Sequence, residues 1–238
     1  MSTPPIILDG SVDDPHAELW FAEPPGFLPL PLDNLLAEPG TPGAEALRTA
    51  TAPLLESAPT EMARQKFVAL LASGQRMLGA LREFGTVHCA VGLHRDDVRG
   101  PADGGAQPLL SLLTVAWRDT SPAPRAATVA RVAAELVDHE HIEYVDLPTG
   151  PLTLSESVLR PAADSGLPQL PLLQIHARLP HPDCRRLAVL TLSTTATARR
   201  QEYRTILRQV VETVRFEKPL GTLRHCPVKR LSGDRAPR

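Results

Sequence analysis

This chain has 238 residues, of which 42% are hydrophobic and 22% are charged. That composition is ordinary for a globular protein, and it excludes wholesale disorder. The formal net charge of −2 disfavours a nucleic-acid binder that relies on a general basic surface.

The N-terminal residues are expected to form a loose arm followed by a packed extended segment. Residues 1–18 are polar and interrupted by prolines, and they show no periodic apolar face. Residues 19–32, LWFAEPPGFLPLPL, carry aromatic and aliphatic side chains between prolines. Because proline cannot donate a hydrogen bond inside a sheet, this segment is expected to be an edge strand or an extended cover. Trp20, Phe21 and Phe27 are expected to anchor it on the core.

Two helices and two strands are predicted next. Over 43–57, Leu47 lies about two turns before Leu54 and Leu55, which indicates a helix. Over 60–83, apolar side chains recur at three- and four-residue steps, which indicates a second helix that Gly85 is expected to end. Thr86–His94 alternates with a period of two, as a strand does. Leu109–Trp117 is an almost continuous apolar run, which predicts a strand that is covered on both faces.

The second half of the chain predicts a helix, a run of strands and a last helix. The first helix covers 124–136, with Pro124 near its start. Short turns then separate four strands, 141–147, 152–160, 170–179 and 186–194. The last helix, over 198–214, has the apolar stripe Tyr203, Ile206, Leu207, Val210, Val211 and Val214. Its solvent side is expected to carry Arg199, Arg200, Arg204 and Arg208.

These elements together predict the fold class. Helices and strands do not alternate strictly, so a doubly wound parallel sheet is disfavoured. The short turns between the later strands indicate antiparallel hairpins. We therefore expect an α+β fold with a largely antiparallel sheet of about six strands sandwiched by helices. Residues 19–220 are expected to form a single domain, and residues 221–238 a flexible basic tail.

Cysteine usage and targeting signals predict the compartment. Cys89, Cys184 and Cys226 are too few and too scattered for a disulfide framework. The first residues, MSTPPIILDG, lack the basic and apolar regions of a signal peptide, and no run reaches the roughly 18 apolar residues of a membrane helix. We therefore expect a reduced, cytoplasmic protein with no membrane partner.

Two segments resemble the PsbP-like superfamily. They are PPGFLPLPL at 24–32 and LAVLTLSTTATARRQEYRTILRQVVETVRFEKPL at 187–220, and they are most similar to actinobacterial members such as the lipoprotein LpqN. In that family a proline-flanked segment precedes the sheet, and the last strand leads into a helix with a Phe-x-x-Pro-like stop. The resemblance implies an antiparallel sheet sandwiched by helices. It implies no enzymatic activity, because the family consists mainly of adaptor and assembly proteins.

Few residues suggest chemistry. The sequence contains no nucleophile elbow, P-loop or dinucleotide-binding glycine motif. The histidines lack the spacing of a zinc site, so no metal and no cofactor is expected. Glu143, Asp146 and Glu156 lie on neighbouring predicted strands and could pair with histidines, but nothing fixes their separation. No catalytic residue is therefore assigned.

One polar stripe is the candidate ligand site. His88 and His94 share a face of one predicted strand, and Gln174, His176 and Arg178 share a face of another. Side by side, the five residues would bind a small anion or a peptide carboxylate through the guanidinium of Arg178. The alternative is an ordinary solvated face of an antiparallel sheet.

The sequence favours a non-enzymatic interaction protein: an adaptor, assembly or accessory component of a cytoplasmic system, with another protein as its partner. A secretion-related or gene-cluster role would be a natural setting. The alternative is a small-molecule binding protein or an enzyme that uses the polar stripe around His176. A pocket that holds His88, His176 and Arg178 together would favour the alternative, and a flat or filled sheet face would favour the adaptor.

Overall fold

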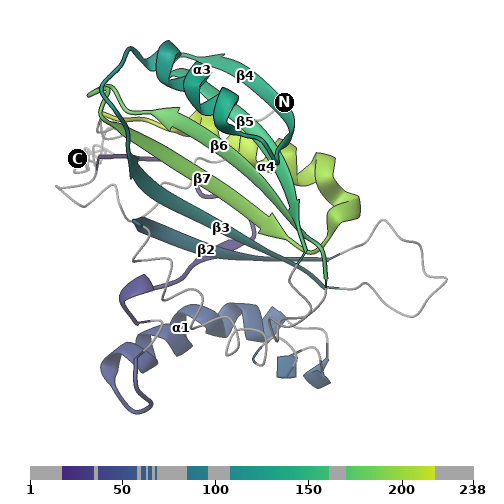
Figure 1. Ribbon diagram of the computed structural model, residues 1–238. Helices are drawn as coiled ribbons and strands as arrows, with labels where there is room; N and C mark the ends of the chain where they lie inside the picture. The colour runs from purple at the N-terminus through teal and green to yellow at the C-terminus, as the bar shows by residue number, and fades with distance from the viewer. Residues whose placement is uncertain are drawn as a thin grey trace, which may run out of the picture.

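The computed structural model describes residues 18–34, 37–57, 85–95, 108–160 and 170–217, with a few positions between 60 and 68. Within this part the fold is α+β, as the sequence predicts, with helices packed against one antiparallel sheet (Figure 1). The arm expected over 1–18, the basic tail over 221–238 and most of the helix over 60–83 lie outside the described residues.

Seven antiparallel strands form the sheet, one more than the sequence expectation, in the spatial order β1-β2-β3-β7-β6-β5-β4. Their bounds are Phe27–Pro29 (β1), Thr86–Arg95 (β2), Pro108–Asp119 (β3), Glu140–Leu147 (β4), Gly150–Leu159 (β5), Leu172–Pro180 (β6) and Arg186–Thr194 (β7). β1 is the edge strand that the proline-rich segment predicts, because its proline and short length end the ladder there. β4 to β7 follow one another as hairpins, which confirms the strands predicted after residue 140.

Three helices match predicted segments: α1 (Pro42–Ser57), α3 (Arg125–Glu135) and α4 (Arg200–Thr213). Short 3-10 turns precede two of them, η2 over Leu32–Asn34 and η4 over Thr197–Arg199. Pro124 is the N-cap residue of α3, where its missing backbone N–H removes no helical hydrogen bond. No helix in the described part of the chain is long and apolar enough to span a membrane.

Each strand places alternate residues on two faces of the sheet, which we call the α4 face and the α3 face after a helix that covers each. The register aligns Ala177 with Leu190 in one row and His176 with Thr191 in the next. Ala177 and Leu190 belong to the main hydrophobic core together with Leu207 of α4. The row of His176 and Thr191 therefore lies on the opposite, α3 face.

The main core lies between the sheet and α4. The helix buries Tyr203, Leu207, Val210 and Val211, four members of its predicted apolar stripe. Trp20, Phe21 and Phe27 are also buried, as expected, and the backbone of Trp20 pairs with that of Arg215 just beyond α4. The N-terminal segment therefore closes one side of this core.

The α3 face is covered only in part by the described helices. α1 packs against the β2 end, where Leu47 and Leu55 contact a small core that contains Cys89 and Val91. α3 packs over β5 and β6, near the other end of the sheet (Figure 1). Seven strands spaced by about 4.8 Å span roughly 29 Å, whereas each helix covers only about 10 Å. A strip over β7 is therefore left between the two helices.

Candidate ligand-binding site

Three of the five predicted site residues lie together on the α3 face. Gln174, His176 and Arg178 occupy alternate positions of β6, and all three side chains are half-buried. The Gln174 amide donates to the hydroxyl of Ser193 on β7, at 3.3 Å. Across the other neighbour, Arg178 donates to the hydroxyl of Ser155 on β5, at 2.7 Å. The predicted polar stripe therefore exists on β6 and extends onto both neighbouring strands.

The other two residues lie on the opposite face. Nε2 of His88 is 3.0 Å from a carboxylate oxygen of Glu23, and its ring meets the edge of the Phe21 ring. His94 lies between the rings of Phe27 and Tyr203, against α4. Burial lowers the pKa of His94 below the usual histidine value. The structure therefore splits the predicted set, and no single pocket holds His88 together with His176.

A hollow of about 430 Å³ opens on the α3 face, and we call it the α3 hollow. Nine residues line it: Arg118 from β3; Val132, Glu135 and Leu136 from α3 and its end; His176 and Arg178 from β6; and Leu187, Val189 and Thr191 from β7. It occupies the strip of sheet that α1 and α3 leave uncovered. Its floor is polar on β6 and mainly apolar on β7.

Arg178 is the principal charge in the α3 hollow. Among the described residues, its guanidinium has a neutral hydroxyl partner in Ser155 and forms no ion pair with a carboxylate. Burial lowers the pKa of Arg178 to about 10, so the side chain remains a cation at neutral pH. A half-buried cation that forms no direct ion pair is costly, and an anion entering the hollow would supply such a partner.

His176 supplies a neutral polar group beside this cation. Its Nδ1 lies 2.9 Å from the hydroxyl of Thr191, and its ring is 5.0 Å from that of His139 between ring centroids. Burial, with smaller contributions from the positive charges of Arg178 and His139, lowers the pKa of His176 to about 3. The ring therefore carries no charge at neutral pH, and its other nitrogen, Nε2, lies 3.5 Å from the hydroxyl of Ser157.

Ser155 and His139 form the serine–histidine contact of this region, with Oγ and Nδ1 separated by 3.0 Å. Ser155 is fully buried, and its hydroxyl oxygen already accepts the hydrogen bond from Arg178. A nucleophile must reach its substrate, and this hydroxyl is not accessible to one. Its geometry fits a structural support that orients Arg178 and His139.

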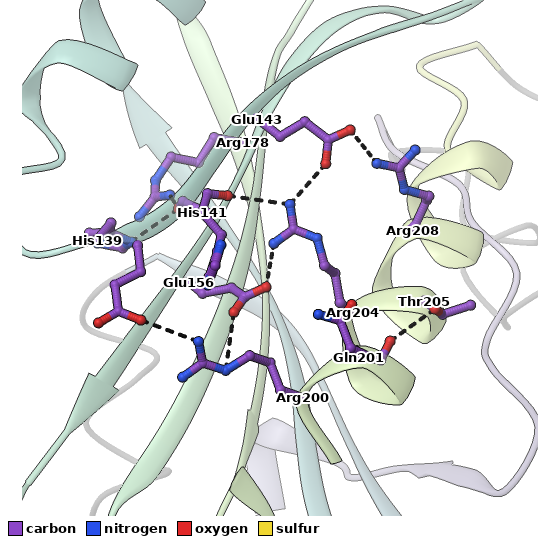
Figure 2. Close-up of polar contacts among 12 residues, drawn as sticks. His139, His141, Glu143, Glu156, Arg178, Arg200, Gln201, Arg204, Thr205 and Arg208 are labelled. Carbon is purple, nitrogen blue, oxygen red and sulfur yellow. Dashed lines mark hydrogen bonds and ion pairs between the residues drawn. The ribbon is translucent and has the colours of Figure 1, made fainter. Parts of the chain in front are cut away.

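A second charged cluster lies on the α4 face and corrects an expectation from the sequence. Arg204, predicted to lie on the solvent side of α4, donates to Glu156 and Glu143 on the sheet, as Figure 2 shows. Glu156 is only 1% exposed, and Nε of Arg200 lies 3.4 Å from its second oxygen. The two carboxylates therefore pair with arginines of α4 and not with histidines.

Local backbone geometry supports this cluster. The pairing of β4 with β5 shifts register between Glu140 and Glu143, and His141 within the shift has a φ of 48°. The carbonyl of His141 accepts a hydrogen bond from Arg204 at 3.3 Å. Glu143 also pairs with Arg208 one turn further along α4. The cluster thus fastens α4 to β4 and β5, and its charges satisfy one another.

Several polar residues in and around the α3 hollow are not identified from the sequence. Thr191 and Ser193 alternate with leucines on β7, and Ser155 and Ser157 occupy alternate positions of β5 with Glu156 between them. That alternation is a signal that could have extended the stripe to both strands. Val132, Glu135 and Leu136 of α3 and its end line the hollow because of tertiary packing, which the local sequence pattern does not predict.

In the residues that the structure describes, no group of three or more histidine, cysteine or acidic side chains could hold a metal ion.

No family model, curated protein or solved structure matches this chain.

Proposed function

We propose that this chain is a non-enzymatic interaction protein, an adaptor or accessory component that recognises an anionic group of its partner in the α3 hollow. One observation carries the proposal: Arg178, a half-buried cation without a carboxylate partner in the described part of the chain, lines that hollow. A ligand that brings the missing negative charge removes the cost of the unpaired cation. Binding of such a ligand also stabilises the folded state.

The fold class and the serine–histidine geometry support this proposal. An open antiparallel sheet packed by helices is what the resemblance to the PsbP-like superfamily implies, and that family is composed mainly of adaptor and assembly proteins. Complete burial of Ser155 favours binding over covalent catalysis at this site. We extend the proposal to a cytoplasmic accessory role with a secretion-related or gene-cluster setting.

The size of the α3 hollow favours a second candidate function, a small-molecule binding protein. Its volume of about 430 Å³ falls within the roughly 300–1,000 Å³ of ordinary ligand pockets. Like such pockets, the hollow combines aliphatic side chains with polar groups that could orient a ligand. Both candidates use the same cation, so the first experiment tests the role of Arg178.

Affinity capture from the native host with three immobilised proteins tests the proposal. The wild-type chain is compared with Arg178→Met and with Arg48→Met, since Arg48 is an exposed arginine on α1. We expect a specific partner with the wild type and Arg48→Met that is lost with Arg178→Met and in high salt. Equal recovery of that partner with Arg178→Met would contradict a role for the α3 hollow.

A further inference from the structure

The formal charges of the side chains that line the α3 hollow favour a ligand with a single negative charge. Arg118 and Arg178 are cationic, Glu135 is anionic, and burial keeps His176 neutral at neutral pH. The lining therefore carries a net charge of about one positive unit at neutral pH. A phosphate monoester carries about −1.5 to −2 at neutral pH and would leave uncompensated charge beside Glu135. A carboxylate matches the lining.

Hydrogen-bonding geometry also favours a carboxylate. Nη1 of Arg178 is committed to Ser155, which holds the guanidinium in place and leaves its other N–H donors for a ligand. Two donors at one edge of a guanidinium match the two oxygens of a planar carboxylate. Because Ser155 is buried and His139 contacts the same hydroxyl, this orientation is fixed before a ligand arrives.

Apart from Thr191, whose hydroxyl contacts His176, the remaining lining is aliphatic. Val132 and Leu136 belong to α3 and its end, and Leu187 and Val189 belong to β7, so the apolar side chains come from two different elements. These side chains offer dispersion contacts to a branched aliphatic group but no further hydrogen bonds to it. A ligand that joins a carboxylate to such a group would use the polar and the apolar parts of the hollow together.

We infer that the α3 hollow binds a carboxylate attached to a branched aliphatic group. This inference rests on the proposed function and gives the chemistry of the recognised anion. Two sources share that chemistry: the free C-terminus of a polypeptide that ends in leucine or valine, and a small branched-chain carboxylic acid. Arg178 binds the carboxylate, and the four aliphatic side chains of the lining contact the branched group.

Calorimetric titration of the full chain measures the binding of two carboxylate probes, a short peptide that ends in leucine and 4-methylpentanoate. Their relative affinities distinguish the two sources of the carboxylate. The same peptide with an amidated C-terminus and methyl phosphate are the matched counter-probes. We expect amidation to weaken binding about tenfold or more, because it removes a charge-assisted hydrogen-bonded pair. Binding of the peptide but not of 4-methylpentanoate would assign the C-terminus of a partner, and equal binding of both would assign the small acid.

Variants connect the binding to the site. Arg178→Met should lose the carboxylate binding, Arg178→Lys should retain part of it, and Arg48→Met should leave it unchanged. Val189→Asp, which places a like charge in the hollow, should also abolish it. Thermal melts of each variant check that the fold is intact.

Two results would overturn the inference. One is equal affinity for the free and amidated peptides, or no binding of either carboxylate probe at millimolar concentration. The other is tighter binding of methyl phosphate that still depends on Arg178; in that case the proposed recognition of an anion by Arg178 survives and only the carboxylate assignment fails. Capture of a partner that does not depend on Arg178 would instead contradict the proposed function.

Discussion

Each face of the sheet holds a half-buried arginine, and the two arginines differ in their partners. On the α4 face, Arg204 donates to Glu143 and Glu156. On the α3 face, Arg178 donates to the neutral hydroxyl of Ser155 and forms no ion pair with any described carboxylate. Figure 2 draws both side chains, that of Arg204 on α4 and that of Arg178 on a strand of the sheet. The comparison separates a charge that holds the fold together from a charge that is available to a ligand.

The pKa values of the two arginines reflect this difference. Burial alone would lower the pKa of Arg204, but its hydrogen bonds to Glu143 and Glu156 outweigh burial and raise it above the usual value. Burial lowers the pKa of Arg178 to about 10, without a carboxylate to oppose it. Removing the charge of Arg204 should therefore destabilise the fold, whereas removing the charge of Arg178 should not.

The largest effect is expected from Glu156→Gln. This change keeps the shape of a side chain that is 1% exposed, but it leaves Arg200 and Arg204 without their shared carboxylate. Removing one partner of a buried ion pair typically costs about 3–5 kcal/mol. Urea unfolding followed by circular dichroism measures the change in the free energy of unfolding.

Glu140→Gln is the matched control for that measurement. Glu140 pairs with Arg200 on the surface, and its side chain is 65% exposed. An exposed ion pair contributes only about 0–1 kcal/mol, so this variant should remain close to the wild type. Equal losses from the two variants would show that the burial of Glu156 does not matter and would remove the contrast between the faces.

The next effect is expected on α4 itself, from Leu207→Ala and Arg204→Ala. Leu207 is fully buried, and its truncation should cost about 2–5 kcal/mol. The sequence predicts a small effect for Arg204→Ala, but its ion pairs with Glu143 and Glu156 lead us to expect a loss of about 2–4 kcal/mol. Thermal and urea unfolding measure both variants. Gln201→Ala on the exposed side of α4 is the control, and a result for Arg204→Ala close to this control would contradict the cluster.

A smaller effect is expected from pH on the α3 face. The pKa of His176 is about 3 in the folded protein, against about 6.5 in the unfolded chain. As the pH is lowered, the unfolded state therefore binds a proton at this histidine before the folded state does. The contribution of neutral His176 to the free energy of unfolding is fully present above about pH 6.5 and falls as the pH is lowered toward 3. The loss approaches about 1.4 kcal/mol per pH unit for this one group.

Urea unfolding of the wild type and of His176→Gln at neutral and mildly acidic pH tests that sign. The variant should lose less stability on acidification. Some slope should remain, because burial lowers the pKa values of His94 and His139 as well. An identical acid response of both proteins would show that His176 titrates normally in the folded state.

The smallest effect on stability is expected from Arg178→Met. Replacing a half-buried cation that pairs with no described carboxylate by an apolar side chain of similar length should change the free energy of unfolding by no more than about 0.5 kcal/mol, or increase it. Ser155 keeps its contact with His139 in this variant. A loss as large as that of Arg204→Ala would mean that Arg178 has a structural partner, and the α3 hollow would lose its main support as a binding site.

The periodic spacing of apolar residues is the signal that predicts the helices and strands from the sequence. Alternation in β2 and β6 and the stripe of α4 depend on neighbouring residues only, so these elements were predicted close to their bounds. Alternation does not say which face of the sheet a residue joins, and His88 was therefore grouped with His176 although pairing through β3 and β7 places them on opposite faces. The stripe of α4 likewise predicts that Arg204 lies on the solvent side of the helix. Its partner Glu156 lies 48 residues away in the chain, so the helix pattern alone does not reveal the pair. Local patterns do not contain such long-range contacts.

The order of the strands also determines how the chain has to fold. β4 to β7 pair with their sequence neighbours, whereas β3 joins them only through β7, and the hydroxyl of Thr194 donates to the carbonyl of Leu110, 84 residues away. Local hairpins close quickly, but a contact of that separation loses far more chain entropy before any pairing energy is gained. We therefore expect the C-terminal half to assemble first and the docking of β3 along β7 to limit the folding rate of the sheet.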